Sequence, residues 1–306
     1  MKQKYLPIAL VLGLLVAMPT WVCAKVQVFT CEPEWASLAE AIGGDVVTAH
    51  SATTARQDPH YIRARPSLIA KMRRADLVVC SGADLEIGWL PILLKKAGNA
   101  GVQPGNENYI EAANIVPVLE KPAKVDRSMG DVHPQGNPHV HLNPYNILKV
   151  AKVLNQRLQA LDPSNAAAIK KQYAEFSNRW QQAIVRWEQQ AAVLKGKRII
   201  THHKAWSYLL DWLNIDLVNT LEPKPGIPPN TGHLETLLQQ VKGVPVLAIV
   251  RAPYAPAAGS EWLAEKTGIP ALVLPFTVGG SKGATDLFGL FEETLRPLIE
   301  VAHAQH

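Results

Sequence analysis

Residues 165–194 read NAAAIKKQYAEFSNRWQQAIVRWEQQAAVL and contain neither glycine nor proline. Apolar side chains in this stretch recur at steps of three and four residues, the period of one face of an α-helix. They are Tyr173, Phe176, Trp180, Ile184, Trp187, Ala191 and Leu194. Such a helix would span roughly 45 Å at about 1.5 Å per residue. The stretch therefore predicts a rigid rod that joins two lobes, and its aromatic spacing favours buried packing over a nucleic-acid stacking face.

On both sides of this rod, short apolar segments alternate with amphipathic segments of helical period. Before the rod, we expect strands over 26–30, 46–49 and 77–80 and helices near 35–42, 66–74 and 87–96. After it, we expect strands over 198–201, 216–221, 246–250 and 271–274 and helices over 206–213, 231–241 and from about 286. This alternation is typical of βαβ units and predicts an α/β fold with parallel sheets flanked by helices.

The length of 306 residues suits two domains. We assign residues 1–24 to a signal peptide, 25–162 to an N-terminal lobe, 163–196 to the linking helix and 197–306 to a C-terminal lobe. With 47% hydrophobic and 19% charged residues, the chain can bury a sizeable core, which excludes global disorder.

The first residues have the pattern of an export signal. Lys2 and Lys4 precede an apolar run over 6–18, and small residues lead to predicted cleavage after Ala24. A membrane anchor is disfavoured because the run is shorter than the roughly 20 residues that a bilayer needs. A lipoprotein is disfavoured because Trp21 and Val22 precede Cys23. We therefore expect a soluble exported protein. Its mature part has 29 basic and 26 acidic residues and no dense basic block, which disfavours nucleic-acid binding.

Cys31 and Cys80 are the cysteines that remain after cleavage. Each lies at the end of an expected strand, and these two strands would be neighbours in a parallel sheet. An oxidising compartment allows such a pair to form a disulfide, which we predict; two buried thiols are the alternative. Neither cysteine has a thiol or imidazole partner at the spacing of a zinc finger.

Three histidines lie beside expected strand ends or loops: His60 in Asp58-Pro59-His60, His139 in Asn137-Pro138-His139 and His203 in Thr201-His202-His203. One such histidine alone is ordinarily a surface or core residue. Turns at the same edge of two sheets, however, converge on the crevice between lobes, where α/β proteins bind ligands. Neutral imidazole nitrogens suit zinc. The three histidines therefore predict a zinc site between the lobes.

Several short motifs follow one another over nearly the whole mature chain. Those of the first half are Asp58-Pro59-His60, Arg65-Pro66-Ser67, Ala75-Asp76-Leu77-Val78-Val79, Leu85-Glu86 and Trp89. Those that follow are Asn137-Pro138-His139, Leu142-Asn143-Pro144, His203-Lys204-Ala205-Trp206 with Tyr208, and the run from Glu222 to Pro229. In this order they resemble the zinc and manganese solute-binding proteins of ABC importers.

The resemblance implies two four-stranded parallel-sheet lobes, one long connecting helix and a metal ion held between the lobes. It also implies delivery of that ion to a membrane permease. By motif position, His60, His139 and His203 carry over as metal ligands. The third position is commonly a carboxylate in manganese-selective relatives. Three nitrogen donors therefore favour Zn²⁺ over manganese.

The fourth ligand departs from the family pattern. Relatives often supply an aspartate shortly after the last strand, but residues 274–280 contain no acid. The nearest acid is Asp286, which we take as the fourth ligand; the alternative is a residue at a helix N-terminus, favoured there by the dipole. A water, Glu32 or Glu34 are the remaining possibilities for the position.

Other histidines receive lesser roles. His141 is two residues from His139, so in an extended segment both would face one side and His141 would assist capture. His202 and His203 would face opposite sides, and the resemblance selects His203. His133 lies in a short loop where zinc-specific relatives often carry a long His-rich run, so a metal-scavenging loop is weakly indicated.

The sequence thus predicts a monomeric periplasmic protein that binds Zn²⁺ with high affinity, delivers it to an ABC permease of the inner membrane and is not an enzyme. A carrier that passes zinc to another periplasmic protein is the alternative, and a manganese receptor is a weaker one. A secreted zinc hydrolase would need a general base near the metal. No His-Glu-x-x-His motif is present, and the sequence shows no obvious general base beside these histidines.

Overall fold

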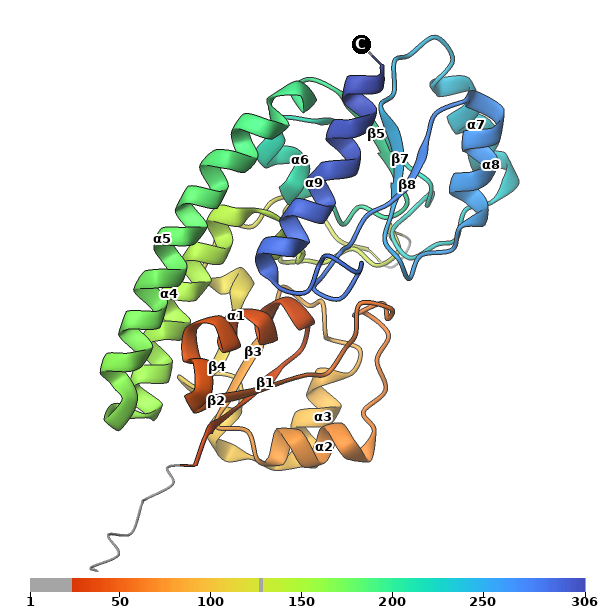
Figure 1. Ribbon diagram of the computed structural model, residues 1–306. Helices are drawn as coiled ribbons and strands as arrows, with labels where there is room; N and C mark the ends of the chain where they lie inside the picture. The colour runs from red at the N-terminus through yellow and green to blue at the C-terminus, as the bar shows by residue number, and fades with distance from the viewer. Residues whose placement is uncertain (1–23, 127–128, 306) are drawn as a thin grey trace, which may run out of the picture.

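The computed structural model describes residues 24–126 and 129–305, and it contains two four-stranded parallel sheets (Figure 1). The strands of the first sheet, in the order β2-β1-β3-β4, are β1 (Val26–Thr30), β2 (Val47–Ser51), β3 (Leu77–Cys80) and β4 (Tyr109–Glu111). The second sheet has the equivalent order β6-β5-β7-β8, with β5 (Arg198–Thr201), β6 (Asp216–Thr220), β7 (Ala248–Arg251) and β8 (Ala271–Val273). The predicted α/β class is confirmed.

Helices flank both sheets and run between them. They are α1 (Pro33–Gly43), α2 (Pro66–Arg73), α3 (Leu90–Ala97), α4 (Pro144–Leu161), α5 (Ala166–Gln190), α6 (Ser207–Leu213), α7 (Thr231–Gln240), α8 (Ala258–Thr267) and α9 (Leu287–Ala304). Short 3-10 turns are η1 (Gly44–Val46), η2 (Ala100–Val102), η3 (Ala112–Asn114), η5 (Val140–Leu142), η6 (Pro163–Asn165) and η7 (Ala191–Leu194). In the described part of the chain, no helix is long and apolar enough to cross a membrane.

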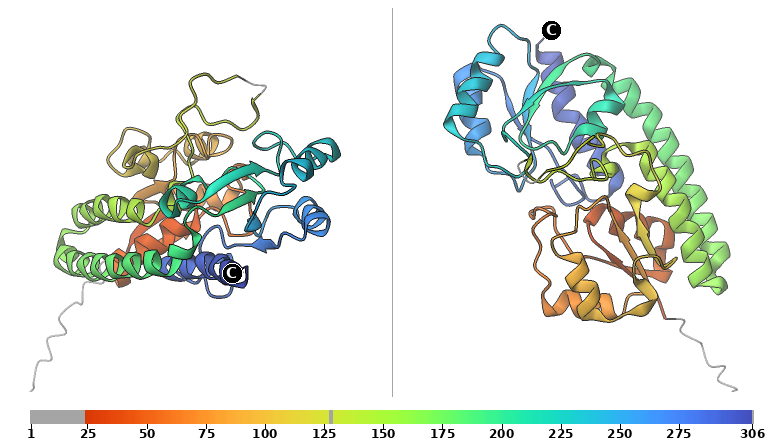
Figure 2. Two further views of the ribbon diagram at one scale, coloured as in Figure 1. Left: turned by 90° about the horizontal axis from the view of Figure 1, so that it is seen from above. Right: turned by 180° about the vertical axis from the view of Figure 1, so that it is seen from behind.

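The predicted rod is α5, which continues into η7. Its 25 residues span roughly 37 Å, and it runs along the side of both lobes with α4 beside it (Figures 1 and 2). Phe176, Trp180 and Trp187 are buried on its inner face, and Trp180 meets Phe288 and Phe291 of α9 with ring centroids 4.8 and 5.4 Å apart. The helix is therefore held along its length by packing rather than left as a free linker.

One apolar core continues through both lobes. Its buried side chains come from β1 and α1, pass through α4 and α5 and reach β7 and α9. A smaller cluster that includes Leu68 and Trp89 covers the other face of the first sheet, and a cluster that includes Leu237 and Leu263 covers that of the second. Both sheets are thus buried on two faces, as parallel sheets require.

The carboxyl ends of two neighbouring strands form a switch point in each sheet: β1 and β3 in the first sheet, and β5 and β7 in the second. At a switch point, the chain leaves the two strands toward opposite faces of the sheet. In the first sheet, Cys31 follows β1 and Cys80 ends β3. The two strands are parallel neighbours, and the cysteines form a disulfide with their Cα atoms 4.8 Å apart. The predicted disulfide is therefore present.

The signal peptide expected over residues 1–24 falls almost wholly in residues 1–23, which lie outside the described residues.

Candidate metal centre

Three connections bring His60, His139 and His203 together in the structure. His60 lies in the loop between β2 and α2, His139 immediately precedes η5, and His203 follows β5. One ligand atom from each ring lies within 4.8 Å of those of the other two. The ring centroids are 5.6 Å apart for His60 with either partner and 5.9 Å apart for His139 with His203. Residues far apart in sequence thus form one imidazole cluster.

Two carboxylates orient two of these rings from outside the cluster. Asp58 Oδ1 lies 2.6 Å from His60 Nδ1, and Glu222 Oε2 lies 2.6 Å from His203 Nδ1. A carboxylate accepts a hydrogen bond from Nδ1–H of the ring. The proton is thereby kept on Nδ1, and the lone pair of Nε2 remains free for a metal ion. Burial alone would raise the pKa of Asp58, but the hydrogen bonds and charge of His60, together with the charge of His203, outweigh burial and lower it. Asp58 is therefore ionised at neutral pH and suited to this role.

His139 is the most deeply buried ring of the cluster. Its side chain is 1% exposed, and neither ring nitrogen has a hydrogen-bond partner among the described residues. Burial, with the neighbouring His60 and His203, holds its pKa well below the ordinary value. A neutral imidazole without a partner in the interior costs about 1–3 kcal/mol. Coordination of a metal ion would satisfy the nitrogen that faces the other two rings.

His133 also reaches the cluster. Its Nε2 lies 3.2 Å from His60 Nε2, and burial lowers the pKa of His133 to about 4, so the ring is neutral at pH 7. It belongs to residues 129–135, a segment that we call the strap because it contacts both lobes. Asp131 accepts a hydrogen bond from the Tyr61 hydroxyl of the first lobe, and its amide donates to the Pro225 carbonyl of the second at 2.8 Å.

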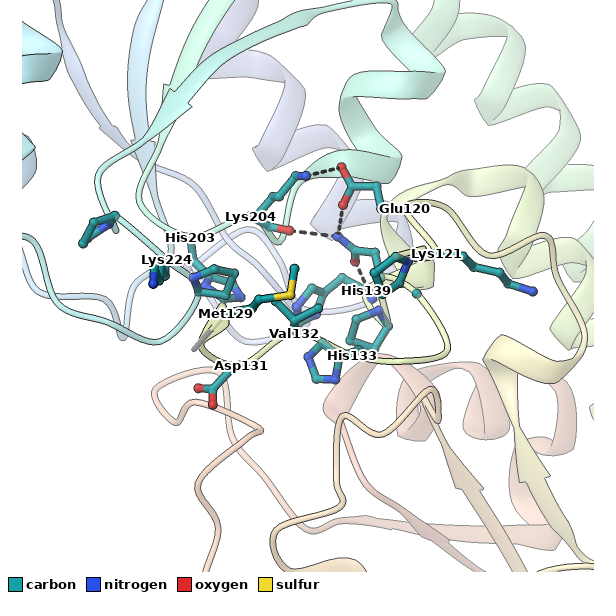
Figure 3. A pocket seen from close by; sticks show the side chains of 16 residues that line it. Glu120, Lys121, Met129, Asp131, Val132, His133, His139, His203, Lys204 and Lys224 are labelled. Carbon is teal, nitrogen blue, oxygen red and sulfur yellow. Dashed lines mark hydrogen bonds and ion pairs between the residues drawn. The ribbon is translucent and has the colours of Figure 1, made fainter. Parts of the chain in front are cut away.

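Cavities lie on either side of the strap. One of about 630 Å³ is lined by His133, His139 and His203, together with Lys204 and prolines of both lobes (Figure 3). Lys204 forms an ion pair with Glu120 at 3.0 Å at its wall. A second cavity, of about 660 Å³, is lined by His60 and again by His133. The cluster is therefore reached from the surface on both sides of His133.

The structure does not bring Asp286 to the histidines. Asp286 is exposed, and its Oδ1 accepts a hydrogen bond from the Gly289 amide at 2.8 Å, so it caps the N-terminus of α9. This is the alternative interpretation that the sequence offered, and it corrects the expectation of a fourth ligand at this position. A carboxylate at an N-cap satisfies free backbone amides and the helix dipole, which explains an acid here without a metal.

The two glutamates considered for the fourth position point elsewhere. Glu32 Oε2 accepts from the Ser81 hydroxyl at 3.0 Å beside the disulfide, and burial and the nearby Glu86 raise its pKa well above the ordinary value. Glu34 accepts from the Thr277 hydroxyl, and its Oε1 lies 3.1 Å from His141 Nδ1. Both carboxyl groups are engaged within the protein.

His141 and His202 lie near the cluster but are not part of it. His141 belongs to the turn η5 rather than to an extended segment, and its Nε2 donates to the Phe276 carbonyl at 2.9 Å. His202 is buried with its Nε2 3.7 Å from Glu222 Oε1. The choice of His203 over His202 for the cluster therefore agrees with the structure.

Asp58 and Glu222 lie within sequence motifs, but no role was predicted for either residue. A carboxylate two residues before a candidate histidine was a usable signal for Asp58. Glu222 is brought to His203 because β6 lies beside β5, which only a known strand order reveals.

Comparison with known proteins places the chain in a family. The model of the family described as "Zinc-uptake complex component A periplasmic" matches residues 28–301. The chain belongs to this family. Its relatives include proteins named "Manganese ABC transporter substrate-binding lipoprotein PsaA" and "Zinc-binding lipoprotein AdcA", both from Streptococcus pneumoniae. PsaA is 24% identical over 83% of this chain and 80% of its own length, and AdcA is 22% identical over 84% of this chain and 52% of its own length.

Solved structures show the same fold. The crystal structure of a protein titled ZnuA superposes with a TM-score of 0.73 at 20% identity, covering 91% of this chain and 98% of that one. Family membership makes this protein a metal-binding substrate-binding protein of an ABC transporter, and not an enzyme. The relatives include both manganese and zinc binders, so the family alone does not choose the metal.

Proposed function

We propose that this protein captures Zn²⁺ in the periplasm, as a monomer, and delivers it to an inner-membrane ABC permease. The observation that supports zinc is the donor set. His60, His139 and His203 converge, and within the described residues this group contains no carboxylate. Zinc accepts nitrogen donors at about 2.0–2.1 Å, whereas manganese prefers carboxylate, carbonyl and water oxygen. Among the divalent metals, zinc also stands above manganese in the general order of complex stability.

The proposal extends to the fourth position, for which His133 is the best-placed protein donor. Two ligands on a tetrahedral zinc with bonds of about 2.05 Å are separated by about 3.3 Å. The His60 and His133 Nε2 atoms are 3.2 Å apart, close to that separation. Both rings are accessible from the cavities beside the strap. His133 is not among the donors that all lie within 4.8 Å of one another. The strap would therefore have to shift for His133 to supply the fourth nitrogen, and a water would complete the site otherwise.

Metal content and competitive titration test this function. We expect the purified protein to retain zinc and to bind it orders of magnitude more tightly than manganese. His133→Ala should weaken zinc binding, and Asp286→Ala, at the exposed N-cap of α9, serves as the control and should bind like the parent. Manganese bound as tightly as zinc would remove the zinc assignment.

Delivery and export require separate measurements. Cells that lack this protein should grow poorly in zinc-limited medium and recover with the parent chain but not with a variant lacking the three histidines. Recovery that persists without the ABC permease would favour the carrier alternative. N-terminal sequencing of the mature protein should begin at Lys25, as expected for cleavage after Ala24.

A further inference from the structure

A buried polar cluster joins the two lobes directly beside the candidate metal centre. Glu34 belongs to the first turn of α1 in the N-terminal lobe, Thr277 follows β8 in the C-terminal lobe, and His141 lies in η5 between them. The three side chains are only 1%, 6% and 2% exposed, in that order. Polar groups this deeply buried are costly unless they are paired, so their contacts are strongly specified.

The contacts run across the lobe boundary. The Thr277 hydroxyl donates to Glu34 Oε2. The other oxygen, Oε1, lies 3.1 Å from His141 Nδ1 but forms no hydrogen bond with it, and His141 Nε2 donates to the Phe276 carbonyl at 2.9 Å. Glu34 and His141 thus hold residues 276 and 277 of the second lobe through both a side chain and the backbone. The arrangement couples α1, η5 and the segment after β8.

Phe276 transmits this coupling to a metal-binding ring. Its ring meets the His139 ring edge to face, with centroids 5.3 Å apart, and meets His141 at 5.2 Å. His139 has no side-chain hydrogen bond of its own within the described residues. Its ring orientation therefore depends on packing, and Phe276 supplies an edge-to-face contact of the kind that aromatic rings prefer.

We infer that Glu34, His141 and Thr277 are positioning residues that clamp the two lobes together and orient His139 for the metal. The inference rests on the proposed metal site and adds to it. His60 belongs to one lobe and His203 to the other, so the separation of the lobes sets the spacing of the donors. Binding constellations tolerate errors of only about 0.5 Å. A clamp next to His139 fixes this separation at the site itself, whereas α5 fixes it along the outer side.

Variants of Thr277 test the clamp with little change in volume. Thr277→Val removes the hydroxyl and keeps the shape, and Thr277→Ser keeps the hydroxyl. Thr30→Val is the matched control, since Thr30 is also buried and its hydroxyl also donates one hydrogen bond, to the Glu32 carbonyl of its own lobe. We expect Thr277→Val to weaken zinc binding about 10- to 100-fold, as for other partners that orient metal ligands, and to alter the absorption spectrum of bound Co²⁺. Thr277→Ser should restore both.

Hydrogen exchange of the metal-free protein separates the clamp from the proposed function. In the metal-free protein, amides of η5 and of residues 276–280 should exchange faster in Thr277→Val than in the parent or in Thr30→Val, whichever metal the loaded protein binds. A parent protein that binds no zinc, combined with this change in exchange, would refute the zinc function and keep the clamp. Unchanged exchange, or thermal destabilisation equal to that of Thr30→Val with zinc affinity and Co²⁺ spectrum intact, would overturn the clamp.

Discussion

The two lobes end their first strands with the same turn and use it differently. In the N-terminal lobe, the Thr30 hydroxyl at the end of β1 donates to the Glu32 carbonyl at 3.1 Å. In the C-terminal lobe, the Thr201 hydroxyl at the end of β5 donates to the His203 carbonyl at 2.9 Å. Glu32 and His203 are therefore equivalent positions on equivalent backbones. Side chains and the neighbouring loops, rather than the fold, decide which lobe contributes chemistry at this point.

The surroundings of the two positions explain the difference. Glu32 faces into its own lobe, where the Ser81 hydroxyl donates to it beside the disulfide. His203 faces the other lobe, with Glu222 behind it. The backbone equivalents of Cys31 and Cys80 are His202 and Arg251, because His202 N donates to the Val250 carbonyl as Cys31 N donates to that of Val79. The switch point of the N-terminal lobe thus carries a stabilising disulfide, and that of the C-terminal lobe supplies His203 as a candidate ligand.

The largest effect on zinc affinity is expected from substitution of one of the two equivalent residues, His203 and Glu32. His203→Ala should weaken zinc binding by more than about 100-fold, since even partners behind a ligand contribute 10- to 100-fold. Glu32→Ala should leave zinc binding close to that of the parent and lower the unfolding free energy of the metal-free protein by about 1–3 kcal/mol, because a buried hydrogen-bonding group is lost. Competitive titration and urea unfolding measure the two effects. Equal losses of zinc affinity in both variants would make Glu32 a ligand.

An effect on stability alone is expected from the disulfide, which the C-terminal lobe lacks at the equivalent positions. The bond closes a loop with a sequence separation of 49 residues. Replacing both cysteines by serine should lower the unfolding free energy of the metal-free protein by roughly 2–4 kcal/mol. Zinc affinity should remain near that of the parent. Two reactive thiols per chain in the unfolded, unreduced protein would show that the bond does not form.

A further expected effect is a pH dependence of stability that arises at the N-terminal switch point. Burial raises the pKa of Glu86 to about 7, above its ordinary value of 4.5. The folded protein therefore binds this proton more tightly than the unfolded chain. The associated stability is fully present below about pH 4.5 and is lost as pH rises toward and through 7. Each proton contributes a slope of at most about 1.4 kcal/mol per pH unit.

Glu86→Gln provides the measurement for this effect. The amide does not titrate, so the difference in unfolding free energy between parent and variant should change between pH 5 and pH 8, in the direction of a weaker parent at high pH. The metal-free protein is used, and the subtraction cancels the groups that Glu86 does not influence; Glu32, whose pKa Glu86 raises, changes with the substitution. Parallel curves for parent and variant would contradict a raised pKa at Glu86.

The sequence predicted the regular elements well where they are long or strongly apolar. The rod, the first three strands and the disulfide follow from periodicity and from cysteine placement. Three elements were not predicted: β4, α4 and α8. β4 has only three residues and is recognised by its pairing with β3. The signal for α4 was present, because Asn143 caps the helix and Pro144 begins it.

The sequence predicted only part of the candidate site, namely the three histidines. The three histidines adjoin strand ends or motifs, so their convergence follows from topology and resemblance. His133 is 73 residues from His60, and its position depends on the path of the strap between the lobes. Asp286 could not be distinguished from a ligand by sequence, because an acid before a helix serves either as a cap or as a donor. Only the position of α9 decides between these roles.

The continuous core through α4, α5 and α9 has a consequence for the energetics of release. Lobes that share one core should melt in a single cooperative calorimetric transition, with metal raising its midpoint for the whole chain. A ligand shifts a conformational equilibrium only as far as its affinity differs between the two states. Little binding free energy is then consumed in closing the lobes, and spontaneous dissociation is correspondingly slow. Rapid unloading would require a partner that strains the histidine cluster from outside.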